Sequence, residues 1–363
     1  MVYWGLILFF ALFIWVERYS FVIGSIQKKS ANGRKVYCII VAIALILLSF
    51  LRSDAVGKDT QMYHILFEYA KESPSFYELM HSWKSGGTEI GYLAMEYIIS
   101  RFAGFQFHLL LVAIITIVPT MVLIYKYSDN CFFSLFLFVA FGYYGFFMNG
   151  IRQSIAMGIC FLAYICAREK KLRLFLLLIA LAVLFHKSAI VFFPVYWLSK
   201  IKINKYIPYI FCGTVGVAFC LRKALFVFLN MFSRQVYSST SDAGGVRMYL
   251  FMVFTIILLW VYRKSFLKDD SDGNNLSLLY MTAIAGIMWP VVSANSAVFR
   301  LYYYYHAFFI LSVPSLISRI EKKWTKIAIG MFFVVVGCYY LQAYVVHSDL
   351  NYAPYYFFWS SSA

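Results

Sequence analysis

The sequence predicts an all-α fold, that of a polytopic integral membrane protein. Apolar residues make up 63% of the 363 residues, charged residues only 13%, and the mean hydropathy is +0.75. A soluble globular domain is about 45–50% apolar and about 25% charged. Many apolar runs approach the roughly 20 residues that a helix needs to cross a bilayer, which predicts about twelve transmembrane helices. An outer-membrane barrel would show short segments of alternating hydropathy instead.

The first apolar run, Val2–Val16, is predicted to be a membrane span. No basic residues precede it and no small-residue cleavage site follows it, which argues against a signal peptide. The basic segment Glu17–Lys35 places the N-terminus outside, because cytoplasmic loops are rich in Lys and Arg. The short, charged run Glu89–Ala103 is predicted to be an interfacial helix on the outer side.

The other apolar runs are predicted to cross the membrane in alternating directions. They are Val36–Leu51, Phe105–Ile124, Phe132–Met148, Ile151–Ala167, Leu172–Phe185, Ser188–Ser199, Tyr206–Leu221, Val246–Tyr262, Leu276–Val292, Phe299–Ile317 and Trp324–Val346. We therefore expect a single membrane domain over residues 1–363 with both termini outside. Its long outer loops are expected at about residues 52–104 and 222–245, and the polar second loop is expected to act as a mobile lid.

The net charge of +16 does not indicate nucleic-acid binding. The basic residues are scattered between the predicted spans, and most of them fall in loops assigned to the cytoplasm, as the positive-inside rule predicts. The seven cysteines form no CxxC pair and lie almost all within apolar runs, so we expect small packing residues rather than disulfides or metal ligands.

Four polar segments interrupt the apolar pattern at predicted span ends on the outer side. The most prominent runs from Asn149 to Ser154 and contains Arg152 and Gln153. An ionisable residue at such a place is costly and is a candidate functional residue. The other three segments are Arg52 through Asp59, Phe185-His186-Lys187-Ser188, and Asn295 through Arg300. The predicted topology brings all four, together with Glu89, to one face.

Several arginines near one outer pocket indicate a multiply charged anion, because guanidinium groups bind phosphate or carboxylate oxygens in pairs. At a lipid interface this anion would be a lipid phosphate or diphosphate. Carboxylates beside the arginines could accept a proton from a sugar hydroxyl. Tyrosines and tryptophans at the same ends, including Tyr302 through Tyr305, could stack on sugar rings.

Each candidate also has a purely structural interpretation. Arg152 could extend to lipid headgroups, and His186 could be a satisfied interfacial histidine. Asp59 could be a turn residue, and Glu89 could complement a helix dipole. Tyr302 could belong to an aromatic belt at the membrane surface.

No GxGxxG, P-loop, HExxH, nucleophile elbow or DxD pair occurs. These absences argue against chemistry driven by nucleotides or metals, so no cofactor and no metal site are expected.

Four blocks of the sequence resemble the EpsG-like family of Wzy-type polymerases, which act in exopolysaccharide, capsule and O-antigen assembly. They are Phe50-Leu51-Arg52 with Val56-Gly57-Lys58-Asp59 and Tyr63, then Glu89-Ile90-Gly91-Tyr92, then Asn149-Gly150-Ile151-Arg152-Gln153-Ser154-Ile155-Ala156, and Leu184-Phe185-His186-Lys187-Ser188-Ala189. They span about Leu51–Pro194. The sequence departs from the usual family pattern at Lys58, where a small polar residue is common.

The resemblance implies a metal-independent membrane glycosyltransferase of GT-C-like architecture. It would join oligosaccharide repeat units carried on undecaprenyl diphosphate, at the outer face of the bacterial cytoplasmic membrane. Donor and acceptor would both be lipid-linked, and a flippase and a chain-length regulator are the partners usual in such systems.

The mechanism expected on this basis uses the candidate residues in three roles. Arg152 and Arg300, with Arg52 as a third candidate and Asn149, Gln153 and Tyr302 nearby, would bind the departing diphosphate. Asp59 or Glu89 would deprotonate the acceptor hydroxyl, and His186 would orient a phosphate or act as the base.

Two other functional classes are alternatives to a polymerase. A lipid-linked-oligosaccharide flippase would need charged residues along a path to both faces, whereas here they gather on one. An O-antigen-type ligase would share the donor but would transfer to a lipid A core. A non-enzymatic scaffold gives no reason for buried arginines.

Overall fold

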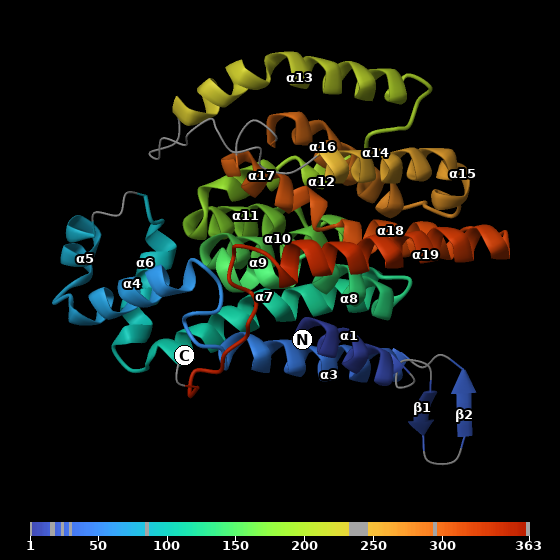
Figure 1. Cartoon of the computed structure of the whole chain (residues 1–363). Coiled ribbons are helices and arrows are strands. Elements are labelled where there is room, and N and C mark those ends of the chain that lie inside the picture. Colours follow the sequence, from blue (N-terminus) through green and yellow to red (C-terminus); the bar gives the residue numbers. More distant parts are fainter. Residues whose placement is uncertain are drawn as a thin grey trace.

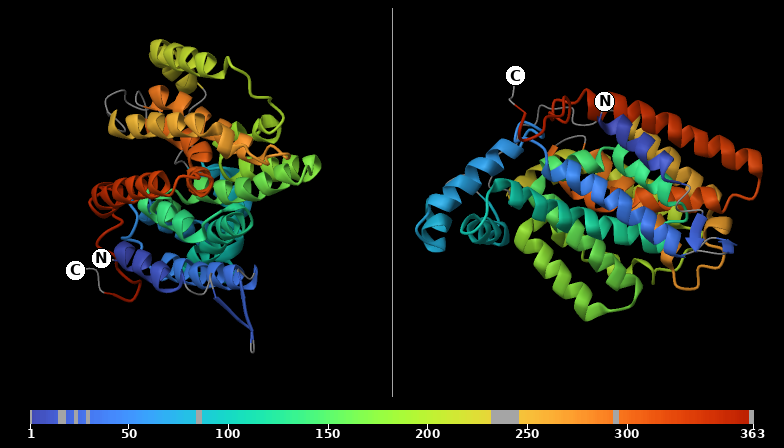
Figure 2. Two further views of the ribbon diagram at one scale, coloured as in Figure 1. Left: turned by 90° about the vertical axis from the view of Figure 1, so that its right-hand side faces the viewer. Right: turned by 90° about the horizontal axis from the view of Figure 1, so that it is seen from below.

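The computed structural model describes residues 2–14, 19–22, 25–28, 31–83, 87–231, 246–292 and 296–360. Most helices run along one common direction and stack in layers, with α13 outermost on one side and α1 and α3 on the other (Figure 1). A lobe made of α4, α5 and α6 projects beyond one end of this bundle (Figure 2). The predicted all-α character is therefore confirmed for the bundle.

The helices follow the apolar runs closely. Their bounds are α1 Val2–Leu12, α3 Ala31–Phe50, α4 Thr60–Glu72, α5 Phe76–Ser82, α6 Ile90–Ser100, α7 Phe105–Tyr127, α8 Cys131–Ala140, α9 Tyr143–Asn149, α10 Ile151–Arg168, α11 Leu172–Phe185, α12 Val195–Leu198, α13 Ile207–Met231, α14 Val246–Val261, α15 Arg263–Phe266, α16 Asn274–Val292, α17 Ser296–His306, α18 Phe309–Ser318 and α19 Lys323–Tyr340. A 3₁₀ helix, η1, spans Lys187–Phe192, and a π-helix, η2, continues α19 over Leu341–Val346.

Four of the described helices are long and apolar enough to cross a membrane. They are α3, α7, α10 and α19 together with η2. The pair α8 and α9 is a fifth candidate span, bent by 53° at its break. Several other apolar helices, among them α1, α11 and α14, are shorter. The protein is thus a membrane protein by length and composition of its helices, while the twelve crossings and the GT-C-like architecture remain predictions.

Three predicted elements differ in the structure. The run Ser188–Ser199 is not one α-helix but η1 followed by α12, because Pro194 between them has no amide hydrogen to donate. The run Phe299–Ile317 is divided into α17 and α18, where the amide of Phe308 bonds to the carbonyl of Tyr305 in a tighter turn. The basic segment Glu17–Lys35, predicted as a loop, contains an antiparallel hairpin of β1, Tyr19–Val22, and β2, Ser25–Lys28.

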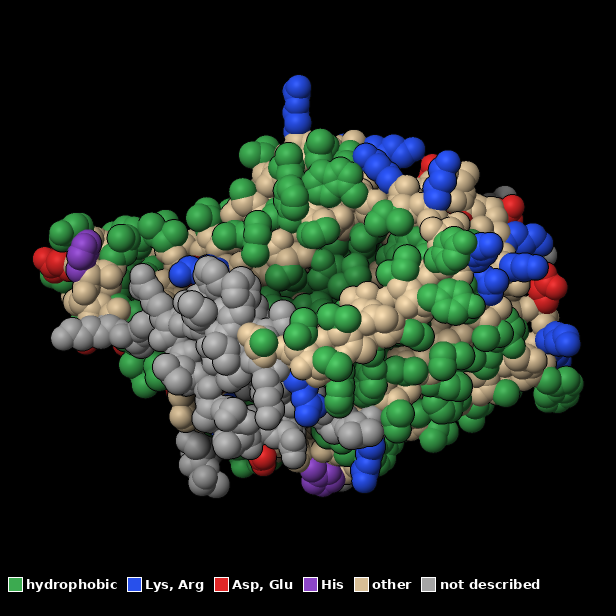
Figure 3. Space-filling view, turned by 90° about the horizontal axis from the view of Figure 1, so that it is seen from above, with side chains coloured by type: hydrophobic (Ala, Val, Ile, Leu, Met, Phe, Trp, Pro, Cys, Tyr) green, Lys and Arg blue, Asp and Glu red, His purple; other side chains and the backbone are tan. Residues whose placement is uncertain are grey.

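Basic loops gather at the end of the bundle that lies opposite the lobe. Lys126 in the last turn of α7 pairs with Glu169 after α10 at 2.7 Å, and Arg319 after α18 pairs with Asp129. Seen from above, many Lys and Arg side chains lie toward this end (Figure 3). The loops that sequence analysis assigned to the cytoplasm therefore share one end of the molecule.

The C-terminal segment ends on the side of the lobe, and the start of α1 lies beside this segment (Figure 1). The hydroxyl of Tyr3 in α1 donates to the carbonyl of Tyr352 near the C-terminus at 3.1 Å. An even number of crossings would give this arrangement. Part of the predicted lid, residues 232–245, and Asn295 lie outside the described residues.

Two glycines shape the centre of the bundle. Gly142, at φ +76°, occupies the left-handed region at the break between α8 and α9, where a side chain would be strained. Gly158 in α10 faces α7 so closely that a Cβ atom there would lie 2.4 Å from the carbonyl oxygen of Ile115. This contact sets the spacing between α7 and α10, the helix whose first turn carries Arg152.

Replacing Gly158 by valine should destabilise the protein by about 1–3 kcal/mol, because the added carbons push against backbone that has no room to move. Thermal unfolding of the purified protein in detergent measures the effect. Gly213→Ala is the matched control, since nothing lies within 4 Å of a Cβ at Gly213. Equal losses for the two variants would mean that α7 and α10 do not pack as closely as described.

Candidate functional site

The candidate site begins at the loop between α3 and α4, which carries Arg52 and Asp59. The C-terminal segment 350–358 lies along this loop and fixes it through backbone hydrogen bonds of 2.9 Å. They join the amides of Ser53, Gly57 and Lys58 to the carbonyls of Tyr356, Asn351 and Leu350, respectively. The loop between α3 and α4 and the C-terminal segment 350–358 therefore pack together beside the site.

Asp59 is held in place by its backbone and not by its carboxylate. Its amide donates to Oδ1 of the buried Asn149 at 2.8 Å, which joins the start of α4 to the end of α9. The Asp59 side chain is half-buried and makes no hydrogen bond or ion pair with any residue that the structure describes. Asn149 thus acts as a positioning residue for Asp59.

Glu89 and Arg152 form an ion pair at the heart of the site. Nη1 of Arg152, in the first turn of α10, lies 2.6 Å from Oε2 of Glu89, which precedes α6. The same Nη1 lies 3.3 Å from the carbonyl oxygen of Gly87. The second carboxylate oxygen, Oε1, accepts the amide of Lys187 at 3.2 Å. Both oxygens of Glu89 are therefore engaged, and three segments of the chain meet at one carboxylate.

His186 ends α11 and lies next to this pair. Its Nδ1 shares a short hydrogen bond with Oγ of Ser188, which in turn lies 3.2 Å from the hydroxyl of Tyr304. Burial lowers the pKa of His186 to about 3, and the positive charges of Arg152 and Arg300 act in the same direction. The imidazole is consequently neutral at physiological pH.

Gln153 connects Arg300 to the site through its backbone. Nε2 of the buried Gln153 side chain donates to the carbonyl oxygen of Arg300 in α17. The guanidinium of Arg300 is partly exposed and makes no hydrogen bond or ion pair with a described residue. It remains available for a ligand.

Tyr63, in the first turns of α4, lies among these charged groups. Burial raises the pKa of its hydroxyl, while the nearby guanidinium of Arg152 acts in the opposite direction, and the charges of Asp59 and Arg300 also act on it. Its ring contacts Tyr92 of α6 edge to face, with ring centroids 5.5 Å apart. Tyr63 therefore marks the point where α4, α6, α10 and α17 converge.

Two sequence candidates lie elsewhere. The side chain of Arg52 is fully buried and donates to the carbonyl oxygens of Ser49 and, at 3.0 Å, Met148. Burial lowers its pKa to about 10, so it stays charged, and it holds the end of α3 against α9. Tyr302 is buried in the core and stacks on His306. Both side chains are therefore enclosed by the bundle.

Sequence reasoning missed several contributions. Ser188 had no predicted role, and Tyr304 was expected only to stack on sugar rings. Their hydrogen-bonded link to His186 depends on the junction between α11 and η1. The amide of Lys187 and the carbonyl of Gly87 contribute through the backbone. Only the position of Ser188, two residues after His186, is a local signal that could have been found.

The resulting arrangement suits a polyanion beside a hydroxyl group. Arg152 and Arg300 supply two guanidinium groups, of which Glu89 balances one. The neutral imidazole of His186 can donate a hydrogen bond to an anionic group, and it can donate to or accept from an uncharged group. The Asp59 carboxylate is free to accept a proton.

Comparison with known proteins gave one result. No curated protein and no solved structure matches the chain. The model of the EpsG family matches residues 35–357, a range that includes every residue of the candidate site. Because this match covers most of the chain, the protein belongs to the EpsG family of Wzy-type polymerase-like membrane proteins.

Proposed function

We propose that the protein polymerises oligosaccharide repeat units carried on undecaprenyl diphosphate, at the outer face of the bacterial cytoplasmic membrane. The observation that carries the proposal is the meeting of Arg152, Arg300 and Asp59, whose carboxylate has no partner among the described residues, at one end of an apolar helical bundle. Family membership supports a polymerase-like activity. The basic loops gather at the opposite end, which supports an outward-facing site.

In the proposed reaction the growing chain leaves its lipid diphosphate and joins the next lipid-linked unit. The bond between the anomeric carbon and the phosphate oxygen breaks, and a bond from that carbon to the acceptor oxygen forms. The acceptor proton passes to the carboxylate of Asp59. Negative charge grows on the departing diphosphate, where the guanidinium groups of Arg152 and Arg300 stabilise it.

Glu89 and His186 have supporting roles in this mechanism. Both carboxylate oxygens of Glu89 are engaged, so it orients Arg152 and leaves the proton transfer to Asp59. A histidine with a pKa of about 3 is a weak base at neutral pH, since a general base works best when its pKa lies near the operating pH. His186 therefore donates or accepts a hydrogen bond at a phosphate or hydroxyl.

Arg152→Ala should lower polymer formation by about 100-fold or more, the cost of removing one preorganised donor at a developing charge. Arg152→Lys should retain more activity but remain impaired, because an ammonium group cannot bind two oxygens as a fork. Polymer is measured by gel from a deletion strain that carries each variant, with protein level measured by immunoblot. Arg247→Ala, at an exposed arginine in the first turn of α14, is the control. Polymer of normal amount and length from Arg152→Ala would refute the assignment.

Asp59→Asn and Glu89→Gln separate the two acids. Asp59→Asn removes the base and should lower the rate by roughly 100- to 10,000-fold. Glu89→Gln keeps the base and should lower the rate by about tenfold, because Arg152 is then misplaced. Turnover of purified lipid-linked repeat units gives both values. Asp54→Asn, which alters a neighbouring acid paired with His64 at 2.9 Å, is the control. If Glu89→Gln were the more damaging variant, the base would be Glu89.

His186 should not contribute an ionisation to the pH profile between about pH 5.5 and 8. Because its folded pKa is lowered to about 3 from an ordinary value near 6.5, the imidazole stays neutral throughout this range. His186→Gln should therefore change the rate but not the shape of the profile. A wild-type inflection near pH 6.5 that disappears in His186→Gln would contradict this expectation.

The same lowered pKa affects stability in a defined direction. Between about pH 6.5 and pH 3 the unfolded chain binds a proton at His186 and the folded chain does not, so this group makes the fold less stable as the pH falls through that range.

A further inference from the structure

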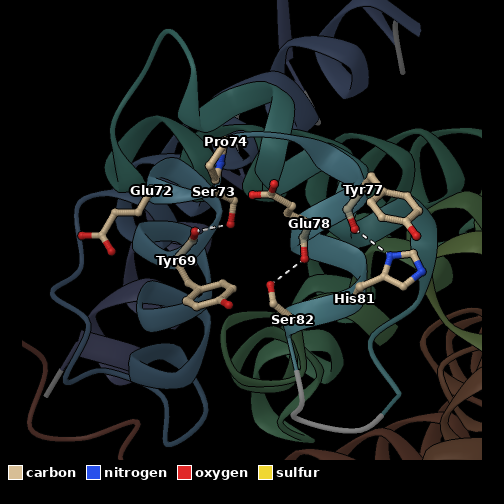
Figure 4. A pocket seen from close by; sticks show the side chains of 8 residues that line it. All are labelled: Tyr69, Glu72, Ser73, Pro74, Tyr77, Glu78, His81 and Ser82. Carbon is tan, nitrogen blue, oxygen red and sulfur yellow. Dashed lines mark hydrogen bonds between the residues drawn. The ribbon is translucent and has the colours of Figure 1, made fainter.

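A cleft lies in the lobe outside the bundle, between α4 and α5. Its volume is about 520 Å³, within the range of about 300–1,000 Å³ that is typical of ligand pockets. Tyr69 of α4 and Glu78 and Ser82 of α5 face one another across it (Figure 4). The mechanism described above makes no use of this cleft.

The groups that line the cleft suit a neutral, hydroxylated ligand. Tyr69 offers a half-buried aromatic ring, and aromatic rings pack against apolar faces of ligands. The carboxylates of Glu72 and Glu78 make no hydrogen bond or ion pair with any described residue, and carboxylates accept hydrogen bonds from hydroxyl groups. The lining residues in the described part of the chain include no Lys or Arg. An anion such as a diphosphate therefore meets no Lys or Arg side chain on this lining, in contrast to the site at Arg152.

A chain of side-chain contacts connects the cleft to the candidate site. The ring of Tyr69 contacts Trp83, with ring centroids 5.3 Å apart. Nε1 of Trp83 donates to Oγ1 of Thr88 at 3.3 Å, and Thr88 lies between Gly87 and Glu89, the two residues that bind Arg152. Along α4, the six residues from Tyr63 to Tyr69 correspond to roughly 9 Å. A chain of a few sugars that starts at the site can thus reach the cleft.

We infer that the α4–α5 cleft binds neutral sugar units of the glycan, a few residues away from the lipid diphosphate. This inference rests on the proposed function for the identity of the glycan. The cleft would hold the saccharide after each addition and so reduce its release from the protein. A tighter hold on the chain favours further additions over termination, which makes Tyr69 and Glu78 determinants of polymer length.

Binding is tested with a soluble probe that lacks the lipid and the diphosphate. Oligosaccharides of two or three repeat units, released from the carrier lipid by mild acid, are titrated into the full-length protein in detergent and followed by saturation-transfer NMR. We expect Tyr69→Ala and Glu78→Gln each to weaken binding by about three- to tenfold, the loss of roughly one stacking or hydrogen-bond contact.

Matched variants control for structure. Tyr69→Phe keeps the ring and its contact with Trp83 and should bind nearly as well as the wild type. Glu68→Gln changes a carboxylate on the same helix that pairs with Lys71 at 3.2 Å and does not line the cleft. Glu78 is exposed, so Glu78→Gln tests the inference even if Tyr69→Ala fails to fold.

The outcomes separate this inference from the proposed function. Weaker binding in Tyr69→Ala and Glu78→Gln, together with shorter polymer in cells and unchanged binding in Arg152→Ala, supports the cleft. The inference is overturned if all variants bind the sugars equally well or if the wild type does not bind them. Binding of a lysine-rich peptide in place of the sugars would also overturn it. If Arg152→Ala makes normal polymer while the cleft variants still lose sugar binding, the proposed mechanism fails and the glycan-binding cleft stands.

Discussion

The ion pair between Arg152 and Glu89 is the interaction on which the candidate site depends. Two charges at the edge of an apolar bundle are costly to remove from water unless each has a close partner. The pair satisfies this condition, and the second oxygen of Glu89 also accepts the amide of Lys187. The start of α6, the start of α10 and the end of α11 are thereby fixed relative to one another. Their geometry places His186 and Tyr63 beside the arginine.

The charges of the protein are divided between two places that suit two parts of one substrate. At the bundle end, Arg152 and Arg300 supply two cations, of which Arg152 pairs with Glu89, and burial together with these two charges keeps His186 neutral. In the α4–α5 cleft the lining carries Glu72 and Glu78 and, among the described residues, no cation. The proposed substrate would be divided in the same way, with an anionic diphosphate at the carrier end and, as inferred for the cleft, neutral sugars beyond it. On the proposed mechanism, each end meets the surface that suits its charge.

The sequence was informative where the signal was local. The bounds of α7, α10 and α11 follow from runs of apolar residues, and the polar segments at Arg152 and His186 stand out because each interrupts such a run. The burial of Arg52 was not predictable, since it depends on the carbonyl of Met148, 96 residues away in the chain. Pro194 marks the break between η1 and α12 in the sequence, but the packing of η1 against α10 and α17 has no local signal. The role of the C-terminal segment 350–358 has no signature in composition at all.

That segment explains why the two acids of the site can differ in function. The loop before Asp59 is held by backbone hydrogen bonds, such as that from Lys58 to Leu350, and by the amide bond from Asp59 to Asn149. Neither contact uses the Asp59 carboxylate. Glu89, in contrast, is positioned through its carboxylate, whose two oxygens are engaged by Arg152 and by the amide of Lys187. On the proposed mechanism the base must be fixed in place without being neutralised, and of these two acids only Asp59 is anchored through its backbone.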